Sequence, residues 1–392
     1  MGEATYCFQT KLLHNQHKVD PNTGAVSVPI QPASTFHQFD MDHFGQYDYS
    51  RSGNPTRAAL EDAIADLEGG VQGFAFASGM AAISTAFMLL SQGDHVLLSE
   101  DVYGGTYRMT SEVLGRFGIE HTFVDTTDIE MVARHIQSNT KVIYIETPSN
   151  PLLKITDIRA VTELAQSHGC LTFVDNTFAT PAVQRPLELG ADVVLHSATK
   201  FIAGHSDVVA GLAVVKDQHL GDQIAFLQNS FGAILGVQDA WLVLRGLKTL
   251  QVRMNQSTAS AKTIAAFLEE HPSVDNVYYP GLASDPGRDL HLSQANDTGA
   301  VLSFSLHDEA AVRQLTEHMQ IPVFSVSLGA VESILSYPAK MSHASMPAVE
   351  REKRGITDGL LRLSVGLEDH DDLIQDLTQA LSGVEAAAVS KQ

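Results

Sequence analysis

The sequence predicts an α/β protein with a mostly parallel sheet and a smaller α+β domain toward the C-terminus. From about residue 60 to 215, strand-like apolar runs alternate with helix-like segments, a rhythm typical of a parallel sheet covered by helices on both faces. The first part of the chain lacks this rhythm, and in the last part long helical segments surround isolated strand-like runs. We therefore divide the chain into residues 1–60, 61–245 and 246–392.

Each segment is predicted for its own reason. The first segment is rich in Pro, Asn, Gln and Ser, which indicates an extended arm. Strands are expected at a series of short apolar runs rich in β-branched residues: FAFA, HVLLS, HTFVD, VIYIE, LTFVD, DVVLH and VVAGLAVV. In the last segment, AKTIAAFLEE and AAVRQLTEHM predict helices and AVLSFSL predicts a strand. Active sites of such sheets lie at the carboxyl ends of the strands, where three of these runs end in Glu146, Asp175 and His196.

Composition narrows the class of protein. A chain of 392 residues with 44% hydrophobic and 18% charged residues can bury a large core. Its formal charge of −21 favours solubility and argues against a nucleic-acid partner, because phosphate backbones would be repelled. Cys7 and Cys170 are the two cysteines, and the N-terminus lacks the pattern of a secretion signal. With no apolar run of about 18 residues, we expect a cytoplasmic protein without a membrane segment.

A lysine stands where a predicted strand ends. Lys200 belongs to HSATKFIAGHSD, which follows the apolar run ADVVLH. Three interpretations are open: a solvated loop residue, the lysine of an S-x-x-K nucleophile signature, or a lysine that forms a Schiff base with a carbonyl group. The second requires S-D-N and K-T-G, and the sequence contains neither. The third requires a cofactor site around the lysine.

A carboxylate ends the preceding predicted strand. Asp175 closes LTFVD, where it can be a simple turn or cap residue. A carboxylate and a lysine at the ends of consecutive parallel strands would nevertheless face the same crevice. Pyridoxal 5′-phosphate requires such a pair, because the lysine holds its aldehyde as an imine and the carboxylate keeps its pyridine nitrogen protonated. Asp175 and Lys200 together therefore predict this cofactor.

A phosphate site is expected beside this pair. In FASGMAAISTAFMLL a helix begins at about residues 78–80, so Gly79 and Met80 would meet phosphate at a helix N-terminus. Ser197 and Thr199 can add hydroxyl groups. Each feature also has a local explanation, helix capping for the first and hydrogen bonds within a turn for the second. No Walker motif and no G-x-G-x-x-G occurs, which argues against a nucleotide.

Further candidates come from YDYSRSGNPTR and DVYGGTYR. Tyr49 and Arg51 lie on one side of an extended segment of the arm, where they can decorate a loop or pair with acidic residues. Tyr103 follows a predicted strand and is placed to lie over a flat ring, although ordinary packing explains it equally well. The acidic segment EDHDD, residues 368–372, is interpreted as the start of a helix, and we predict no metal site.

Together the motifs resemble the Cys/Met-metabolism family of pyridoxal-phosphate enzymes. The similarity extends over nearly the whole chain and is carried by YSRSGNPTR, ASGMAAI, DVYGGTYR, ETPSNP, VDNTF, HSATK with GHSD, and SLGAVES. It implies the type I pyridoxal-phosphate fold, like that of aspartate aminotransferase. Two departures are visible, Phe201 where a tyrosine is common and Ala330 where a glycine is common, and neither removes a reacting group.

The resemblance also implies roles for the cofactor residues. Lys200 would carry the cofactor and move the substrate's Cα proton, Asp175 would pair with the ring nitrogen, and Tyr103 would stack on the ring. The phosphate ligands of one subunit would be Gly79, Met80, Ser197 and Thr199. Tyr49 and Arg51 would reach the phosphate of a neighbouring subunit. The family thus implies active sites shared between subunits, in a homotetramer built as a dimer of dimers.

The implied substrate is a small amino acid. Asn150, Ser327 and Arg362 resemble the residues that clamp it, and Arg362 would bind its α-carboxylate in a fork. Within the family, the C-terminal motifs most resemble the cystathionine β-lyases of Gram-positive bacteria. This implies a carbon–sulfur lyase of transsulfuration and methionine biosynthesis that cleaves L-cystathionine to homocysteine, pyruvate and ammonia. The alternatives are cystathionine γ-lyase, which forms cysteine, 2-oxobutyrate and ammonia, and cystathionine γ-synthase.

Overall fold

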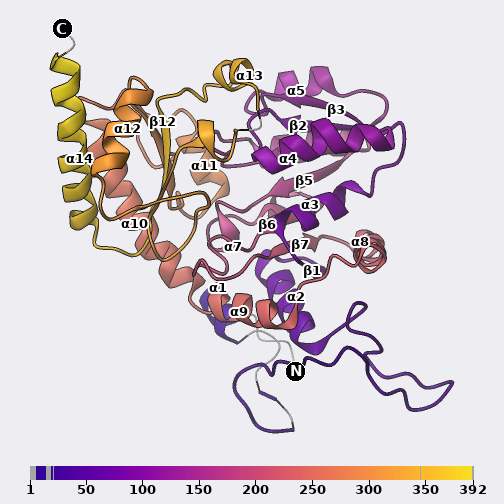
Figure 1. The fold of residues 1–392 in the computed structure, drawn as a ribbon. Helices are drawn as coiled ribbons and strands as arrows, with labels where there is room; N and C mark the ends of the chain where they lie inside the picture. The colour runs from indigo at the N-terminus through magenta and orange to yellow at the C-terminus, as the bar shows by residue number, and fades with distance from the viewer. Residues whose placement is uncertain (1–5, 15–18, 21, 345, 391–392) are drawn as a thin grey trace.

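The computed structural model describes residues 6–14, 19–20, 22–344 and 346–390, which form a large and a small domain side by side (Figure 1). The sheet of the large domain has seven strands in the order β1-β7-β6-β5-β4-β2-β3. Their bounds are β1 Gln72–Phe76, β2 His95–Ser99, β3 Glu120–Val124, β4 Thr140–Glu146, β5 Leu171–Asp175, β6 Val193–Ser197 and β7 Gly211–Val215. Every apolar run predicted as a strand before residue 216 is therefore confirmed.

Most of this sheet is parallel, as predicted. Neighbouring strands from β6 across to β3 run parallel, whereas β7 runs antiparallel to both β6 and β1. The antiparallel pairing of β6 and β7 arises because the connection between them, residues 198–210, contains no helix and returns to the end of the sheet where β6 finishes. Ser197 therefore pairs with Gly211. A parallel neighbour would need a crossover, usually a helix. The loop that carries Lys200 is thus held at both ends by the sheet.

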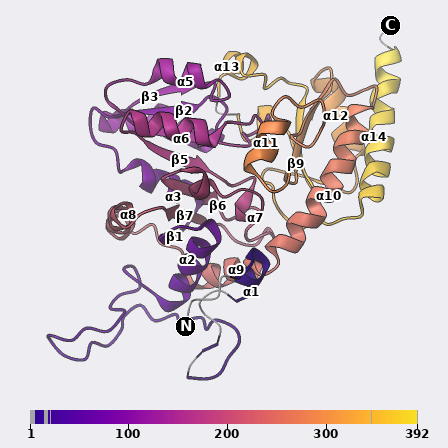
Figure 2. The ribbon, with the colours of Figure 1, turned by 180° about the vertical axis from the view of Figure 1, so that it is seen from behind.

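Helices cover both faces of the large sheet. On one face lie α3 Gly79–Phe87, α4 Gly104–Arg108 and α8 Gln218–Phe231, and on the other lie α2 Pro55–Glu68, α5 Ile129–His135, α6 Ile158–Ser167 and α9 Val237–Leu247 (Figures 1 and 2). Along β4, Val142 and Tyr144 pack on the first face, and Ile143 and Ile145 pack on the second. Because both faces are buried, the strands are continuous apolar runs in the sequence.

The small domain has a second sheet with the strand order β10-β11-β12-β9-β8. Its strands are β8 Asn276–Tyr278, β9 Val301–Ser305, β10 Val323–Phe324, β11 Ile334–Ser336 and β12 Leu360–Ser364. Its main helices are α10 Leu250–Glu269, α12 Glu309–His318 and α14 His370–Ser390, which share its apolar core. The predicted α+β character is confirmed. The shorter segments of the chain are α1 Phe8–Leu13, η1 Met109–Val113, η2 Leu114–Phe117, α7 Thr180–Val183, η3 Pro186–Leu189, α11 Arg288–Gln294, η4 Pro338–Lys340 and α13 Ala348–Lys353.

Helix α10 joins the two domains. Leu250 and Met254 pack into the core of the large domain, and Ile264 and Leu268 pack into that of the small domain. The predicted boundary after residue 245 lies in the last turn of α9, which continues to Leu247. The acidic segment at 368–372 leads into α14, as interpreted from the sequence. In the part of the chain that the structure describes, no helix is long and apolar enough to cross a membrane.

The N-terminal arm extends away from the large domain (Figure 1). Between residues 22 and 54 its only described β-pairing is an isolated bridge of Thr35 with Tyr49. Helix α2 then begins at Pro55, where the side chain of Asn54 accepts a hydrogen bond from Thr56 N. The predicted end of the arm, residue 60, therefore lies within α2.

Candidate active site

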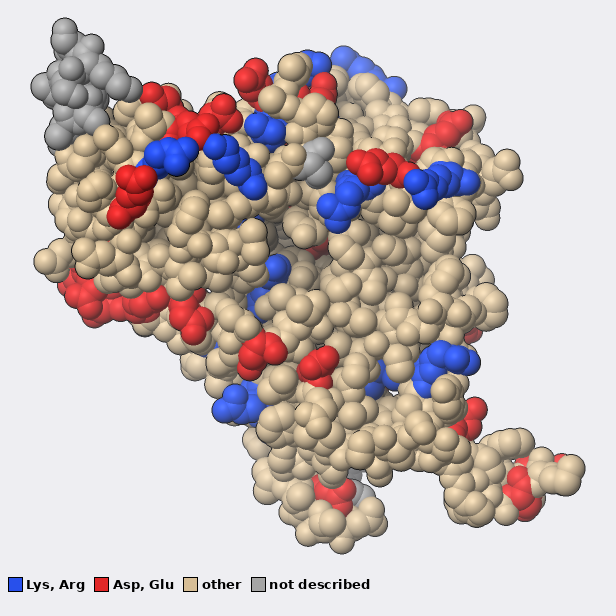
Figure 3. Space-filling model, in the orientation of Figure 1, with Lys and Arg blue, Asp and Glu red and all other residues tan. Residues whose placement is uncertain are grey.

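A cavity of about 650 Å³ lies where the carboxyl ends of the large-sheet strands meet the small domain. A hollow is visible near the middle of this face in Figure 3. Most of the residues predicted for the site line this cavity: Gly79, Met80, Tyr103, Asn150, Asp175, Ser197, Thr199, Lys200, Ser327 and Arg362. The structure thus brings together residues from distant parts of the chain.

Lys200 lies in a tight turn directly after β6. Its backbone N–H donates to Ser197 O at 3.1 Å, and its Nζ donates to the Ser327 hydroxyl at 2.7 Å. Burial, aided by the positive charge of Arg362, lowers the pKa of Lys200 from 10.5 to about 8. A neutral amine is therefore accessible near physiological pH, as a nucleophilic or proton-accepting lysine requires.

Asp175 ends β5 at the floor of the cavity. Its Oδ1 accepts hydrogen bonds from Thr177 N at 3.1 Å and Thr177 Oγ1 at 2.5 Å, and its Oδ2 accepts one from Tyr144 OH at 3.1 Å. Burial raises the pKa of Asp175, and the two bonds from Thr177 oppose that shift. A cation in the cavity would stabilise the ionised carboxylate further. The group is thus suited to a positively charged partner.

A second carboxyl group lies beside Asp175. Glu146 ends β4 and is the register partner of Asp175, and its Oε2 accepts a hydrogen bond from Tyr103 N at 2.8 Å. Burial, followed by the negative charge of Asp175, raises the pKa of Glu146 well above its usual value. Asp175 receives more hydrogen bonds than Glu146, so the ionised form is favoured more at Asp175 than at Glu146. The sequence marked Glu146 as a strand-end residue without assigning it a role.

Helix α3 presents its N-terminus to the cavity. The side chain of Ser78 accepts a hydrogen bond from Ala81 N at 3.0 Å, which leaves the first amides of the helix available to a ligand. A Cβ atom on Gly79 would lie 2.9 Å from Cβ of Ser197, so only glycine lets the helix approach β6 this closely. Thr199 Oγ1 accepts a bond from Ala210 N at 3.0 Å, which positions that hydroxyl beside the helix end. The arrangement suits a phosphate group.

Arg362 reaches the cavity from β12 of the small domain. Its Nη1 donates to Asn150 Oδ1 and its Nη2 donates to Ser327 O, both at 2.7 Å. Its guanidinium carbon lies 5.9 Å from the ring centre of Phe178. Burial lowers the pKa of Arg362 to about 10, so the side chain remains a cation at neutral pH. A buried, oriented guanidinium of this kind suits a carboxylate ligand.

The predicted aromatic and arm residues differ in their positions. Tyr103 is half-exposed at the cavity wall, and a Cβ atom on Gly105 would lie 2.5 Å from its ring. Tyr49 and Arg51 are outside the cavity lining of this chain. Arg51 Nε donates to Asn229 Oδ1 at 3.0 Å, and its guanidinium lies 5.3 Å from the ring centre of Tyr49.

Several lining residues escaped the sequence analysis, among them Arg108, Thr177, Phe178, Met341 and Ser342. Thr177 had a usable signal, because an Asp often accepts hydrogen bonds from the residue two positions later. Met341 and Ser342 reach the cavity only through the packing of the small domain, which no local pattern reveals.

A second cavity, of about 710 Å³, lies between residues 152–155 and 274–290. It is slightly larger, yet none of the predicted site residues lines it. Lys154 on its wall is paired with Glu100 at 2.8 Å. We therefore assign the chemistry to the smaller cavity, which combines an amine of lowered pKa with a strand-end carboxylate.

An amine and a carboxylate on adjacent parallel strand ends, beside a helix N-terminus, form the kind of site found in pyridoxal-phosphate enzymes. The model of the Cys/Met metabolism PLP-dependent enzyme family matches residues 9–382, and the chain belongs to this family. It is therefore an enzyme whose family depends on pyridoxal phosphate, as the sequence predicted.

The chain is similar over nearly its full length to bacterial cystathionine lyases. The chain is 66% identical to cystathionine β-lyase MetC of Bacillus subtilis, over 99% of this chain and 100% of that protein. It is 51% identical to cystathionine γ-lyase of the same organism, over 96% and 99%. Among solved structures, cystathionine γ-lyase of Lactobacillus plantarum complexed with L-serine matches with a TM-score of 0.94 and 48% identity, over 97% of this chain and 100% of that chain.

Proposed function

We propose that this enzyme is a cystathionine β-lyase, which converts L-cystathionine and water to homocysteine, pyruvate and ammonia. The observation that carries the proposal is the 66% identity over the full chain to a cystathionine β-lyase, against 51% to a γ-lyase from the same organism. The cavity supports it, because its charged groups match an amino acid bound beside a pyridoxal ring. Cystathionine γ-lyase is the second candidate, favoured by the similarity to that γ-lyase.

The residues of the cavity fit the cofactor. Lys200 supplies an amine whose pKa burial lowers to about 8, and Asp175 supplies a carboxylate for the ring nitrogen. The open N-terminus of α3, at Gly79 and Met80, and the hydroxyls of Ser197 and Thr199 bind the phosphate. Tyr103, on the cavity wall, would stack on the ring. When bound, pyridoxal phosphate supplies an electron sink for the carbanion formed at the substrate's Cα.

The substrate is oriented by the small domain. Arg362, already held by Asn150 and the Ser327 carbonyl, binds the α-carboxylate. This places Cα near Lys200 Nζ, which accepts the Cα proton and delivers protons in later steps of the reaction. The hydroxyl of Ser327, bonded to Nζ in this structure, holds the amine in the cavity. Together these contacts select amino acids with a free α-carboxylate.

A complete site would use two subunits. Tyr49 and Arg51 lie outside their own chain's cavity. In the proposed assembly they bind the phosphate of a neighbouring subunit. Phe39, Met41 and Phe44 on the N-terminal arm are exposed by 73%, 91% and 69%. Exposed apolar side chains gathered on an arm are typical of a protein interface. We infer a homotetramer, a dimer of dimers, in which the arms complete the sites.

The deciding experiment identifies the keto acid. The holoenzyme is incubated with L-cystathionine, and the products are separated and identified by mass spectrometry. Pyruvate with homocysteine supports the β-lyase. Dominant 2-oxobutyrate with cysteine would replace the proposal with the γ-lyase, and absence of both keto acids would contradict a lyase of either kind.

A further inference from the structure

Two loops carry residues that contact the ligands in the proposed function. Residues 100–103, between β2 and α4, carry Tyr103, and residues 149–154, after β4, carry Asn150. A hydrogen bond from Ser149 Oγ to Asp101 Oδ2 ties these loops directly together. Neither Asp101 nor Ser149 lines the cavity.

When Asp101 is ionised, its carboxylate only accepts hydrogen bonds, so the donor in this bond is the hydroxyl of Ser149. Its oxygen accepts a hydrogen bond from Lys154 N at 3.0 Å, so its single proton is free to point to Asp101. The backbone of Ser149 is bonded as well, with its N–H donating to Lys154 O and its carbonyl accepting from Leu153 N, both at 3.0 Å. Ser149 is thus rigidly held, and the residue that follows it is Asn150.

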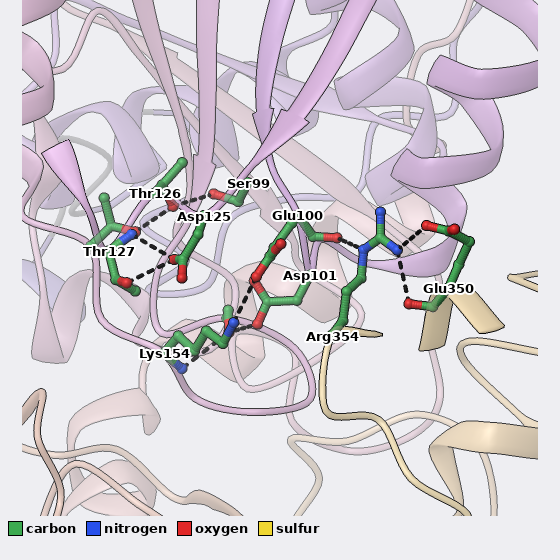
Figure 4. Close-up of polar contacts among 11 residues, drawn as sticks. Ser99, Glu100, Asp101, Asp125, Thr126, Thr127, Lys154, Glu350 and Arg354 are labelled. Atoms are coloured by element: carbon green, nitrogen blue, oxygen red, sulfur yellow. Dashed lines mark hydrogen bonds and ion pairs between the residues drawn. The ribbon is translucent and has the colours of Figure 1, made fainter. Parts of the chain in front are cut away.

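A second connection runs parallel to the first. Lys154 Nζ contacts Glu100 Oε1 at 2.8 Å, and Arg354 Nε donates to Glu100 O at 2.8 Å (Figure 4). Arg354 Nη1 is bonded in turn to Glu350 Oε2 of α13 at 2.7 Å. The loop before Tyr103 is therefore anchored to the turn that carries Asn150 and to the small domain.

The surroundings of Asp101 make it a good hydrogen-bond acceptor for Ser149. Its side chain is almost fully buried, with 3% exposure for the residue. Burial raises the pKa of Asp101 to about 6, while the charge of Lys154 and the bond from Ser149 favour the ionised form. Above this pH the carboxylate is a strong, fixed acceptor for the Ser149 hydroxyl.

We propose that Asp101 is a positioning residue of the active site. Through Ser149, Asp101 holds the neighbouring Asn150 in the position from which the Asn150 side chain binds Arg362. Asp101 also lies in the loop of Tyr103 and fixes the position of that residue. Asp101 thereby fixes the position of Tyr103, which stacks on the ring, relative to Arg362, which binds the substrate carboxylate. This role rests on the proposed function and names the residue that aligns the substrate-binding groups.

The test uses holoenzyme variants and glycine, an α-amino acid without a leaving group. Glycine binding is followed by the change in cofactor absorbance at pH 8, where Asp101 is ionised. We expect Asp101→Ala and Ser149→Ala each to raise the glycine dissociation constant about tenfold, the effect of losing one hydrogen bond to a charged group. The double variant should lose less than the sum of the two single losses, because both single variants remove the bond between Ser149 and Asp101.

Two controls separate positioning from general damage. Asp101→Asn keeps an oxygen that can accept from Ser149, and should bind glycine within about threefold of the unaltered enzyme. Asp125 follows β3 and accepts from Thr127 N at 3.0 Å, without contacting the cavity, so Asp125→Ala should leave glycine binding unchanged.

Defined outcomes overturn the proposal. Unchanged glycine binding in Ser149→Ala refutes the proposal, even if Asp101→Ala fails to fold. If Asp125→Ala weakens glycine binding equally, the effect reflects a general loss of stability and the proposal is also refuted. Glycine binding is independent of which bond of cystathionine is cleaved. An enzyme that binds glycine but forms neither keto acid would therefore contradict the proposed function while leaving this test intact.

Discussion

Lys200 Nζ and Ser327 Oγ lie 2.7 Å apart, although one residue belongs to the large domain and the other to the small domain. The reactive amine is therefore held by a residue 127 positions away in the chain. Ser327 also offers its carbonyl to Arg362, so one residue contacts both the amine and the carboxylate clamp. Under the proposed function, correct docking of the two domains would be required for catalysis.

The first prediction concerns the pH at which Lys200 becomes reactive. The neutral amine reacts with the cofactor's aldehyde, and burial with the charge of Arg362 disfavours the protonated form. The rate at which apo-protein binds pyridoxal phosphate should therefore rise with pH through a midpoint at about 8. Stopped-flow absorbance measures this rate. A midpoint near the ordinary lysine value of 10.5 would show that Lys200 is not desolvated.

Asp175 provides the second prediction. Asp175→Asn removes the charge that stabilises a protonated ring nitrogen, so turnover should fall by more than about 100-fold, or ~2.7 kcal/mol. Cofactor binding should persist in part. Thr177→Val is the matched control, since it removes a donor to Asp175 and the acceptor of Ser197 N but keeps the carboxylate, and it should cost less than the loss of the charge. Near-normal turnover of Asp175→Asn would show that the carboxylate serves only as a turn or cap residue at the end of β5.

The third prediction addresses shared sites. Arg51→Ala and Lys200→Ala are each expected to be inactive, and a mixed dimer should regain one intact site. Mixing the two under exchange conditions should restore up to about a quarter of the activity, since half of the subunit pairs are hybrids with one site of two. Native mass spectrometry verifies that hybrids form. Verified hybrids without activity would place Arg51 in the site of its own chain.

The fourth prediction tests whether Arg362 acts through the geometry of its guanidinium group or only through its positive charge. Arg362→Lys keeps the charge but loses the planar fork that bonds Asn150 and the Ser327 carbonyl. KM for cystathionine should increase at least tenfold or so, with little change in cofactor affinity. Steady-state kinetics and a cofactor titration measure the two quantities. An unchanged KM would remove Arg362 from the substrate clamp.

The fifth prediction tests the contact between the Tyr103 loop and the small domain. A Cβ atom on Gly104 would collide with the backbone carbonyl of Ser342, whereas one on Gly115 would meet open space. Gly104→Ala should therefore lower the melting temperature by several degrees, and Gly115→Ala should not. Differential scanning calorimetry compares the two. Equal melting temperatures would indicate that the loop containing Ser342 yields without cost.

The sequence predicted the parts of the site that follow from local pattern. Asp175 and Lys200 could be identified because apolar runs reveal strand ends, and strand ends of a parallel sheet meet at one edge. Arg362 and Ser327 have no such pattern, and they were assigned only through the family resemblance. The bond between Ser149 and Asp101 joins two strand-end loops 48 positions apart, so it depends on tertiary packing. The antiparallel direction of β7 follows from a helix-free connection and was not foreseen.

The shared helix α10 also bears on how the chain is made. A ribosome releases the N-terminal residues first, so the large-domain core stays incomplete until Leu250 and Met254 have emerged. The helix that supplies them continues directly into the second core with Ile264 and Leu268. The first core also contains Leu328, which follows Ile264 and Leu268 in the chain, so it is completed only after residues of the second core have emerged. The two cores mature together, and the catalytic cavity between them forms only as synthesis nears its end.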